Sequence, residues 1–266
     1  MSRAFQNWVH RKLGGTTVFS KLAVKVRNQA NCVIAARMGA PDSIEDGGEA
    51  QLVKRIAPHV KTFIDVGANV GDWSHQMLKG GAEGGYCVEP SAQCVERLRE
   101  RFRDSKVETL HMALSDRPGT ASFFEEDDFG KKSSLGGRAG KQDGKTREVK
   151  VSTLDEQFAD KPARVDYLKT DCEGWDMRAL KGGEALLKRT RFVQFEYNAF
   201  WLSAGSSLKE AISFLEGYGF KLFLIKDSGL HPLNYSFWGD FFRYANFLAC
   251  REEDLDPVRA LIGEVI

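Results

Sequence analysis

The chain has 266 residues, of which 42% are hydrophobic and 28% are charged, and this composition is typical of a globular protein. The length suits one large α/β domain with an appendage, or two modest domains. No Pro-rich or Gly/Ser-rich tract is long enough to indicate disorder, which excludes fibrous and low-complexity proteins. The five cysteines form no Cys-x-x-Cys pair and have no histidine at zinc-ligand spacing, so we expect neither a disulfide framework nor a structural zinc.

Charge is distributed unevenly along the chain. Residues 1–40 contain seven Lys and Arg and no Asp or Glu, so subtracting seven from the formal net charge of +1 leaves −6 for the remainder. Apolar residues are interleaved with the charges of this basic segment. The segment is either a solvated helical preface to the main domain, or it binds peripherally to an anionic membrane or an acidic partner. Residues 1–30 lack the apolar stretch of a secretory signal and no run of about 18 apolar residues occurs, so we expect a cytoplasmic protein.

Residues 1–60 and 61–266 differ in their hydrophobic pattern. The first part predicts two or three helices, one of them at 49–56, and we expect a cap packed on the following domain. From residue 61, short apolar runs alternate with helical stretches, which is typical of a parallel sheet covered on both faces. The predicted strands are 62–66, 85–89, 107–113, 165–170 and 192–197, and the predicted helices are 73–78, 91–103 and 177–188.

The later part of the chain departs from this alternation. Residues 120–125 and 147–153 predict two extended segments, and the polar residues 127–144 between them are either a lid over a substrate or an ordinary surface insertion. Residues 221–226 and 246–251 predict two further strands, paired antiparallel at the sheet edge. The predicted fold is therefore a doubly wound α/β sheet, mostly parallel, with a ligand at the carboxyl ends of its strands.

A glycine-bearing turn follows the first predicted strand. After Asp65 the chain passes through Gly67 and Gly71 into a helix, and glycine lets a ligand approach the backbone without a Cβ in the way. No Gly-Lys-Ser/Thr follows, and the Gly-x-Gly-x-x-Gly of a pyrophosphate site is incomplete. The Asp65 carboxylate would repel a phosphate but would accept a hydrogen bond from an ammonium group, which favours S-adenosylmethionine. The alternative is a βα turn that binds no ligand.

A second acidic residue ends the next predicted strand. Glu89 lies 18 residues after Gly71, and Pro90 cannot continue the strand. A carboxylate at this place typically accepts hydrogen bonds from the two ribose hydroxyls of an adenosine. The alternative is a solvent-facing Glu at a strand terminus.

Three further carboxylates are expected at the same edge of the sheet. Asp171 and Glu173 follow the strand at 165–170, and Glu196 ends the strand at 192–197. Such a cluster can orient a hydroxyl nucleophile, accept its proton or hold a divalent cation such as magnesium. We expect these three residues to be catalytic, with Asp171 or Glu196 as the general base, and we assign no metal site. The alternative is a set of helix N-cap carboxylates.

The order of these motifs resembles that of the FkbM family of methyltransferases. The matching segments are 63–71, 88–90, 113–116, 133–135, 151–155, 168–174 and 195–196, spread over about residues 61–198. The resemblance implies a class I, Rossmann-like methyltransferase that uses S-adenosylmethionine to methylate an oxygen of a sugar, glycan or natural product. Trp175-Asp176 departs from the pattern of relatives, which puts a catalytic role of position 176 in doubt.

The resemblance also implies the cofactor contacts. Asp65, Gly67, Asn69 and Gly71 would surround the methionine part, Glu89 the ribose, and residues 113–115 the adenine. The whole set of expected cofactor-binding residues is Asp65, Gly67, Ala68, Asn69, Gly71, Trp73, Glu89, Pro90, Ala113, Leu114, Ser115 and Asp171.

Two other classes of function remain as alternatives. One is a methyltransferase acting on protein or nucleic acid, although the chain beyond residue 40 is acidic on balance and has no basic stripe with interleaved aromatics. The other is a nicotinamide-dependent oxidoreductase, which the incomplete glycine fingerprint disfavours. Aromatic residues at 198–202 and 235–238 would stack on sugar rings, pack in the core or form a homodimer interface.

Overall fold

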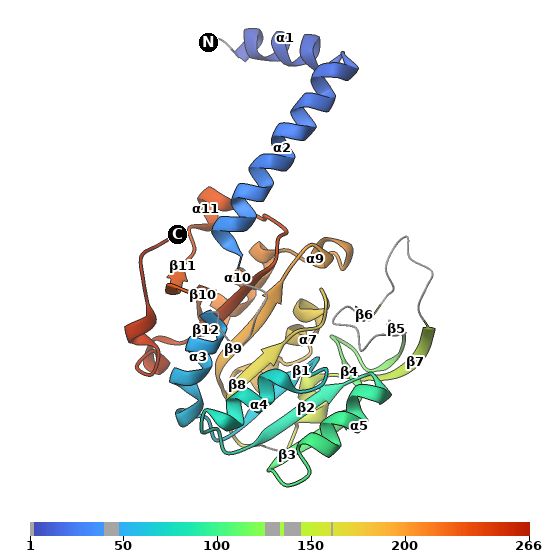
Figure 1. Cartoon of the computed structure of the whole chain (residues 1–266), viewed down its shortest axis with the longest axis vertical. Coiled ribbons are helices and arrows are strands. Elements are labelled where there is room, and N and C mark those ends of the chain that lie inside the picture. The colour runs from blue at the N-terminus through green and yellow to red at the C-terminus, as the bar shows by residue number, and fades with distance from the viewer. Residues whose placement is uncertain (1–2, 40–47, 126–133, 136–144, 161) are drawn as a thin grey trace.

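The computed structural model describes residues 3–39, 48–125, 134–135, 145–160 and 162–266, and it has an α/β architecture (Figure 1). In the described residues an eight-stranded sheet has the order β11-β10-β12-β9-β8-β1-β2-β3. Its strands are β1 (Phe63–Val66), β2 (Gly85–Glu89), β3 (Val107–His111), β8 (Val165–Thr170), β9 (Thr190–Tyr197), β10 (Lys221–Lys226), β11 (Gly229–Pro232) and β12 (Ala245–Cys250). The doubly wound α/β sheet predicted from the sequence is confirmed.

The sheet is mostly parallel, with its reversed strands at one end. β3, β2, β1, β8 and β9 pair in parallel, and β12 pairs antiparallel with both β9 and β10, so β10 again runs with the parallel set. β10 and β12 form the antiparallel pair expected from the sequence, but they do not lie at the edge. β12 is buried along its whole length because it lies between two strands, and the edge strand is β11, which the sequence did not predict.

Helices cover both faces of this sheet. On one face, α3 (Gly48–Ile56), α4 (Asp72–Lys79) and α5 (Ala92–Arg101) bury apolar residues against alternate positions of the strands, such as Phe63. On the other face, α6 (Leu154–Gln157), α7 (Asp176–Lys181), α8 (Glu184–Leu187) and α10 (Leu208–Gly217) pack on the remaining positions, such as Ile64. β1 and β8 are buried on both sides, as expected of central parallel strands.

The predicted helix at 177–188 is wrong in one respect, because it is two short helices. α7 and α8 are separated at Gly182 and Gly183. A Cβ on Gly182 would lie 2.1 Å from the carbonyl oxygen of Ser115, so the close approach of that segment interrupts the helix. Two other short helices, α9 (Phe200–Ser203) and α11 (Tyr235–Trp238), lie in connections after β9 and β11.

A second, small sheet lies beside the main one. It has the order β4-β7-β5-β6, formed by β4 (Ala113–Leu114), β5 (Gly119–Glu125), β6 (Ser134–Leu135) and β7 (Lys145–Ser152). The two extended segments expected at 120–125 and 147–153 are its central antiparallel pair. The predicted strand 107–113 is wrong at its end, because Ala113 leaves β3 and pairs with Val151 of β7, where both are buried with Phe123. Apart from Ser134–Leu135, the expected lid at 127–144 lies outside the described residues.

The N-terminal helices are only partly the packed cap that the sequence predicted. α3 packs through Leu52, Val53 and Ile56, as expected. In contrast, α1 (Arg3–Gly14) and α2 (Thr17–Met38) extend away from the sheet, and α2 buries only Met38 at its C-terminal end (Figure 1). The apolar spacing correctly predicted helices, but periodicity does not reveal which surface, if any, covers a helix face. Among the described helices, none is long and apolar enough to cross a membrane.

Candidate functional site

The glycine loop between β1 and α4 adopts left-handed backbone conformations. Gly67, Asn69 and Gly71 have φ angles of 79°, 50° and 83°. The Gly67 amide donates to the carbonyl oxygen of Val88 at 2.9 Å, which ties the loop to β2. A Cβ on Gly67 would lie 2.0 Å from the carbonyl oxygen of Asp171, so only glycine lets the ends of β1 and β8 approach each other. The order of the strands across the sheet changes direction between β1 and β8. In open α/β sheets, ligands bind at this point.

Asp65 presents an unsatisfied carboxylate oxygen at this point. The residue is 1% exposed, and its Oδ2 accepts a hydrogen bond from the Ser74 hydroxyl at 2.7 Å. Among the described residues, its Oδ1 has no hydrogen-bond partner. Burial raises the pKa of Asp65, while the Lys169 ammonium acts in the opposite direction. Because a buried acceptor without a donor costs free energy, the geometry suits a ligand that brings a donor such as an ammonium group.

Glu89 is fixed by backbone amides at the end of β2. Its Oε2 accepts from the Asn69 amide and its Oε1 from the Ser91 amide, both at 2.8 Å. Burial raises the pKa of Glu89 to about 7, and the two amide hydrogen bonds only partly offset it. Each carboxylate oxygen has a further lone pair, so Glu89 can still accept hydrogen bonds from a pair of hydroxyls. The Asn69 side chain faces its own loop, where its Oδ1 accepts from the Val70 amide at 2.7 Å.

Lys169 places a buried positive charge between these acidic strand ends. Its Nζ lies 2.9 Å from Oδ2 of Asp171, and the Lys169 side chain is 8% exposed. In the sheet register Lys169 lies beside Asp65 on β1 and beside Gln194 on β9. Burial alone would lower the pKa of Lys169, but the carboxylates of Asp171, Asp65 and Glu49 together raise it well above its usual value. Lys169 is therefore an ammonium group that compensates the surrounding negative charge.

Glu49 extends this polar cluster from the N-terminal end of α3. Its carboxylate accepts a hydrogen bond from Nε2 of Gln194, whose Oε1 accepts from the Tyr167 hydroxyl at 2.6 Å. Burial raises the pKa of Glu49, partly offset by the charge of Lys169. Helix α3 thus contributes a side chain to the base of the site.

Glu196 lies at the end of β9 with 9% of its surface exposed. Its Oε1 accepts a hydrogen bond from Nδ2 of Asn198 at 2.6 Å. Burial, followed by the negative charge of Asp171, raises the pKa of Glu196 to about 10, so this carboxyl is protonated at neutral pH. Burial and then Glu196 and Asp171 also raise the pKa of Tyr244, which puts its phenol in the same electrostatic environment.

The turn after β8 depends on a fully buried carboxyl group. Asp176 accepts from the backbone amides of Cys172 at 3.2 Å and Gly174 at 3.3 Å. Burial, followed by the charge of Asp171, raises the pKa of Asp176 to about 7. Glu173 has a positive φ of 50° in this turn, while Asp176 is inaccessible to solvent. Asp176 therefore supports the turn that presents Asp171 and Glu173.

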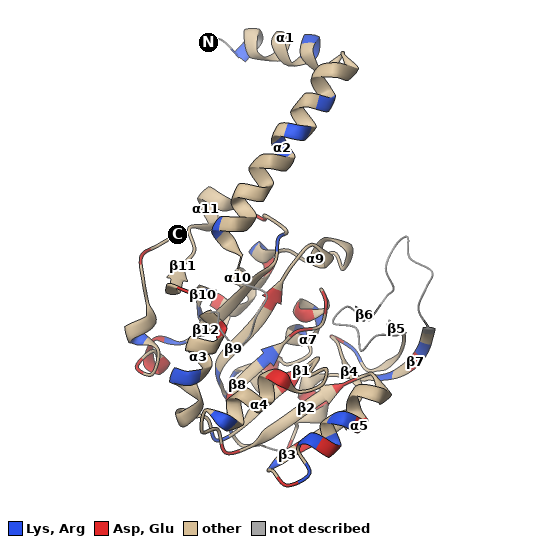
Figure 2. Ribbon diagram, in the orientation of Figure 1, with Lys and Arg blue, Asp and Glu red and all other residues tan. Residues whose placement is uncertain are grey.

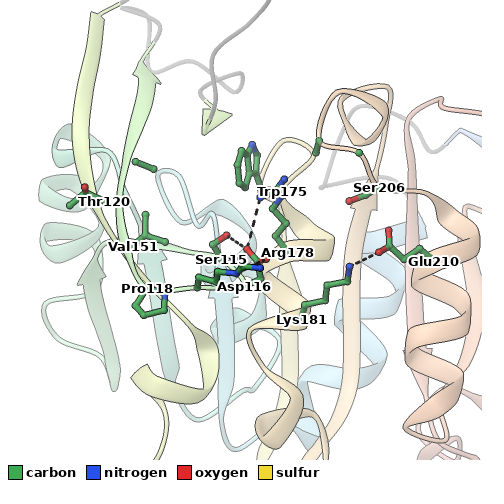
Figure 3. A pocket seen from close by; sticks show the side chains of 15 residues that line it. Ser115, Asp116, Pro118, Thr120, Val151, Trp175, Arg178, Lys181, Ser206 and Glu210 are labelled. Carbon is green, nitrogen blue, oxygen red and sulfur yellow. Dashed lines mark hydrogen bonds and ion pairs between the residues drawn. The ribbon is translucent and has the colours of Figure 1, made fainter.

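A cavity of about 520 Å³ opens beside this turn (Figure 3). Ser115 and the second sheet line one side, and Ser206 and α10 line the other. Between them Arg178 stacks on the Trp175 ring, with 4.4 Å from its guanidinium carbon to the ring centroid. The cavity therefore combines the flat apolar surface of Trp175 with polar side chains such as Arg178, Lys181 and Glu210.

The other residues expected to bind the cofactor have mostly buried side chains. Trp73 is 4% exposed and packs on the rings of Phe63 and Tyr167. Leu114 and Ala113 bury their side chains in the cores of the main and second sheets. The indole Nε1 of Trp73 has no hydrogen-bond partner among the described residues. Contact of these three residues with a cofactor stays a prediction. Ala68, 6% exposed, and the half-buried Pro90 lie beside Gly67 and Glu89 in the chain.

Several polar residues of the site were missed from the sequence. They are Lys169, Glu49, Asn198 and Tyr244. Lys169 had a readable signal, because it is a cation inside an apolar strand, two residues before Asp171 and therefore on the same face. The others come from segments whose sequence does not reveal their distance from the strand ends.

The carboxylates do not form a recognisable metal centre. Within the described part of the chain, no group of three or more His, Cys, Asp or Glu side chains has an arrangement that could hold a metal ion. The Lys169 ammonium lies against Asp171 and neutralises the negative charge that would otherwise attract a metal ion.

The sequence pattern of a known family covers most of this site. The family model described as the methyltransferase FkbM domain matches residues 65–222, which is more than half of the chain. The chain belongs to the FkbM methyltransferase domain family. The match begins at Asp65 and includes Glu89, Lys169, Asp171 and Glu196. The family resemblance inferred from the motifs is therefore confirmed.

Solved structures of methyltransferases resemble this FkbM domain chain. A methyltransferase FkbM from Methylobacillus flagellatus is 14% identical, with a TM-score of 0.46 over 71% of this chain and 43% of that one. An O-methyltransferase from Bacillus cereus in complex with SAH is 14% identical, with a TM-score of 0.42 over 91% and 95% of the two chains. An rRNA methylase from Streptococcus thermophilus is 11% identical, with a TM-score of 0.42 over 76% and 93%.

The chain thus spans less than half the length of the Methylobacillus protein. A search of curated proteins found no match.

Proposed function

We propose that this protein transfers a methyl group from S-adenosylmethionine to a hydroxyl oxygen of a sugar, glycan or natural-product acceptor. The observation that carries the proposal is the unpartnered Oδ1 of Asp65 beside the glycine turn, at the point where the strand order reverses. Membership in the FkbM methyltransferase domain family supports methyl transfer, and the carboxylates around the turn support this cofactor.

The described residues suit S-adenosylmethionine better than a phosphate-bearing nucleotide. Asp65 would accept hydrogen bonds from the ammonium group of the methionine part, and Glu89 would accept from the ribose hydroxyls. Gly67 would leave room beside the backbone for the ligand. When bound, the cofactor supplies an electrophilic methyl group on a positively charged sulfur. A site with two buried carboxylates favours a cation and disfavours a pyrophosphate.

Asp171 is our choice for the general base. Its side chain is 32% exposed, so it can meet an acceptor hydroxyl, and its charge is stabilised by Lys169. Glu196 is protonated at neutral pH and would act as a hydrogen-bond donor toward the acceptor oxygen or Asp171. A positioned base contributes about 10²- to 10⁴-fold to the rate, and orientation of the acceptor supplies the remainder.

The cavity supports a hydroxyl-bearing organic acceptor. About 520 Å³ is enough for a sugar or a compact natural product, and the indole of Trp175 offers a flat apolar surface beside hydrogen-bonding groups. Glu173, on the same turn, would help to orient the hydroxyl. This combination of a ring-sized cavity and polar walls supports a hydroxyl-bearing acceptor.

Calorimetry provides the decisive test of the cofactor. The intact protein should bind S-adenosylhomocysteine and should not bind NAD. Binding of NAD alone would overturn the proposal in favour of an oxidoreductase.

Assays with acceptors then test the chemistry. Asp171→Asn should lower turnover about 10²-fold or more, and this loss should be much larger than the change in S-adenosylhomocysteine affinity. Glu196→Gln should lower turnover much less, because the glutamine amide resembles a protonated carboxyl group. A glycan or polyhydroxylated acceptor should be methylated at oxygen without added magnesium, and transfer only to RNA or protein would contradict the acceptor class.

A further inference from the structure

The two N-terminal helices carry an apolar surface that the rest of the protein does not cover. The large apolar side chains of this arm, defined as residues 3–38, are mostly exposed. They are Phe5, Trp8, Leu13, Val18, Phe19, Leu22, Val24, Val26 and Val33. The side chains of Trp8 and Val33, for example, are 57% and 71% exposed. Exposed apolar surface of this extent marks an interaction site.

Helix α1 is amphipathic with aromatic residues on its apolar side. Phe5 and Trp8 are three residues apart and therefore share one face, and their ring centroids lie 6.1 Å apart in a stacked arrangement. Arg3 and Arg11 lie on the opposite side at a spacing of eight residues. Aromatic rings on one side and Arg on the other are typical of helices that lie in a membrane interface.

Helix α2 also carries a stripe of apolar residues. Phe19, Leu22, Val26 and Val33 share one face, because their spacings of three, four and seven residues follow the helical repeat. A turn at residues 15–16 changes the chain direction, so that α1 crosses the far end of α2 (Figure 1). The arm therefore has a tip helix about 18 Å long, presented away from the catalytic domain.

Charge decides between the partners that could cover this surface. The arm contains seven Lys and Arg and no acidic residue, and Figure 2 shows Lys and Arg without Asp or Glu on α1 and α2. Two arms packed together would bring fourteen positive charges close with no acidic residue to offset them, counting seven from each copy. An anionic surface offsets them directly, because each Lys or Arg near acidic lipid contributes about fivefold to binding.

We propose that residues 3–38 are a membrane-docking arm that binds an anionic lipid surface peripherally. The apolar face of α1 enters the headgroup region, while Arg3 and Arg11 on the opposite side lie near the lipid phosphates. The arm meets the catalytic domain mainly through Met38 and Ile34, so docking leaves the site and its cofactor contacts intact. The proposal is independent of the methyl acceptor.

Vesicle sedimentation with the full chain tests the proposal. The protein should bind phosphatidylcholine vesicles that contain about one third phosphatidylglycerol, and should bind pure phosphatidylcholine at least tenfold more weakly. Binding should weaken as salt rises, because exposed charges are screened. Equal binding to both vesicles, or none to the anionic ones at low salt, would overturn it.

Paired variants separate the apolar contribution from the charge. Phe5→Gln with Trp8→Gln removes the apolar anchor without changing charge and should weaken binding at least tenfold. Arg11→Gln with Lys12→Gln should weaken it about 25-fold. As matched controls, Phe237→Gln changes an exposed aromatic outside the arm, and Arg99→Gln with Arg103→Gln removes two exposed charges of α5 and its end, so both should bind as wild type.

Sedimentation equilibrium tests whether a second copy of the chain covers the apolar surface instead. The protein should be a monomer in the absence of lipid. A dimer that Phe19→Gln with Val26→Gln converts to a monomer would assign the apolar stripe to a second copy and overturn the proposal. S-adenosylhomocysteine affinity and the urea unfolding midpoint should be the same in all these variants, because the arm lies outside the domain core.

Discussion

The Lys169 ammonium lies 2.9 Å from the Asp171 carboxylate, and one strand away it is the register neighbour of Asp65. This placement makes one cation responsible for the charge balance of three carboxylates, since Glu49 also contributes to its pKa. The base of the candidate site is therefore one electrostatic unit that joins β1, β8 and α3. Removing the cation should have consequences for folding as well as for the reaction.

We expect Lys169→Met to lower the free energy of unfolding by about 3 to 5 kcal/mol, because it leaves buried carboxylates without their counter-charge. Urea denaturation followed by circular dichroism measures the change. Lys221→Met is the matched control, because it breaks the ion pair with Glu252, in which both side chains are more than half exposed. Its midpoint should equal that of the wild type. Equal effects of the two variants would contradict the charge-balance argument.

Affinity for S-adenosylhomocysteine should rise with pH. Glu89 has a pKa of about 7 in the protein, and only its ionised form can accept hydrogen bonds from both ribose hydroxyls with both oxygens. If protonation blocks binding, affinity falls about 30-fold from pH 8 to pH 5.5. Calorimetry at several pH values measures this. Glu89→Gln should bind weakly and lose most of the pH dependence, and an unchanged slope in that variant would exclude Glu89 as the titrating group.

Stability of the free protein should decrease with pH in the same range. Burial raises the pKa of Asp176 to about 7 from its ordinary value of 3.8, so the folded protein keeps a proton that the unfolded chain releases. Its contribution is fully present below pH 3.8 and is lost as pH rises through 7, on the order of 4 kcal/mol in all. Urea midpoints at pH 5 and pH 8 measure the loss, and Asp176→Asn should reduce the difference between them. A steeper dependence in the variant would contradict this assignment.

Much of the main sheet could be predicted from the sequence, because buried parallel strands are short apolar runs bounded by glycine and acidic residues. Asp65 and Glu89 could be placed at strand ends for the same reason. The two central strands of the second sheet were predicted as extended segments, but their assembly into a separate sheet was not, since it depends on Ala113 leaving the line of β3 to pair with Val151. That choice depends on contacts between segments far apart in the chain.

The site was predicted less completely than the sheet. Glu196 was correctly placed near Asp171, but burial and the neighbouring charge protonate it, and neither property is readable from a strand-end Glu. Glu49 reaches the site from α3 through Gln194, a contact across 145 residues of sequence. The break at Gly182 likewise reflects the close approach of Ser115 rather than a local preference of the helix.

Two glycines with nearly the same backbone conformation should respond differently to alanine. Gly67 and Gly205 have φ angles of 79° and 74°, but a Cβ on Gly67 would lie 2.0 Å from the Asp171 carbonyl oxygen, whereas nothing lies within 4 Å of one on Gly205. Gly205→Ala should cost about 1 kcal/mol of unfolding free energy, from backbone strain alone. Gly67→Ala should cost at least about 3 kcal/mol more, because β1 and β8 must separate at the site. Urea denaturation compares them, and equal losses would mean that the ends of the two strands are not in close contact.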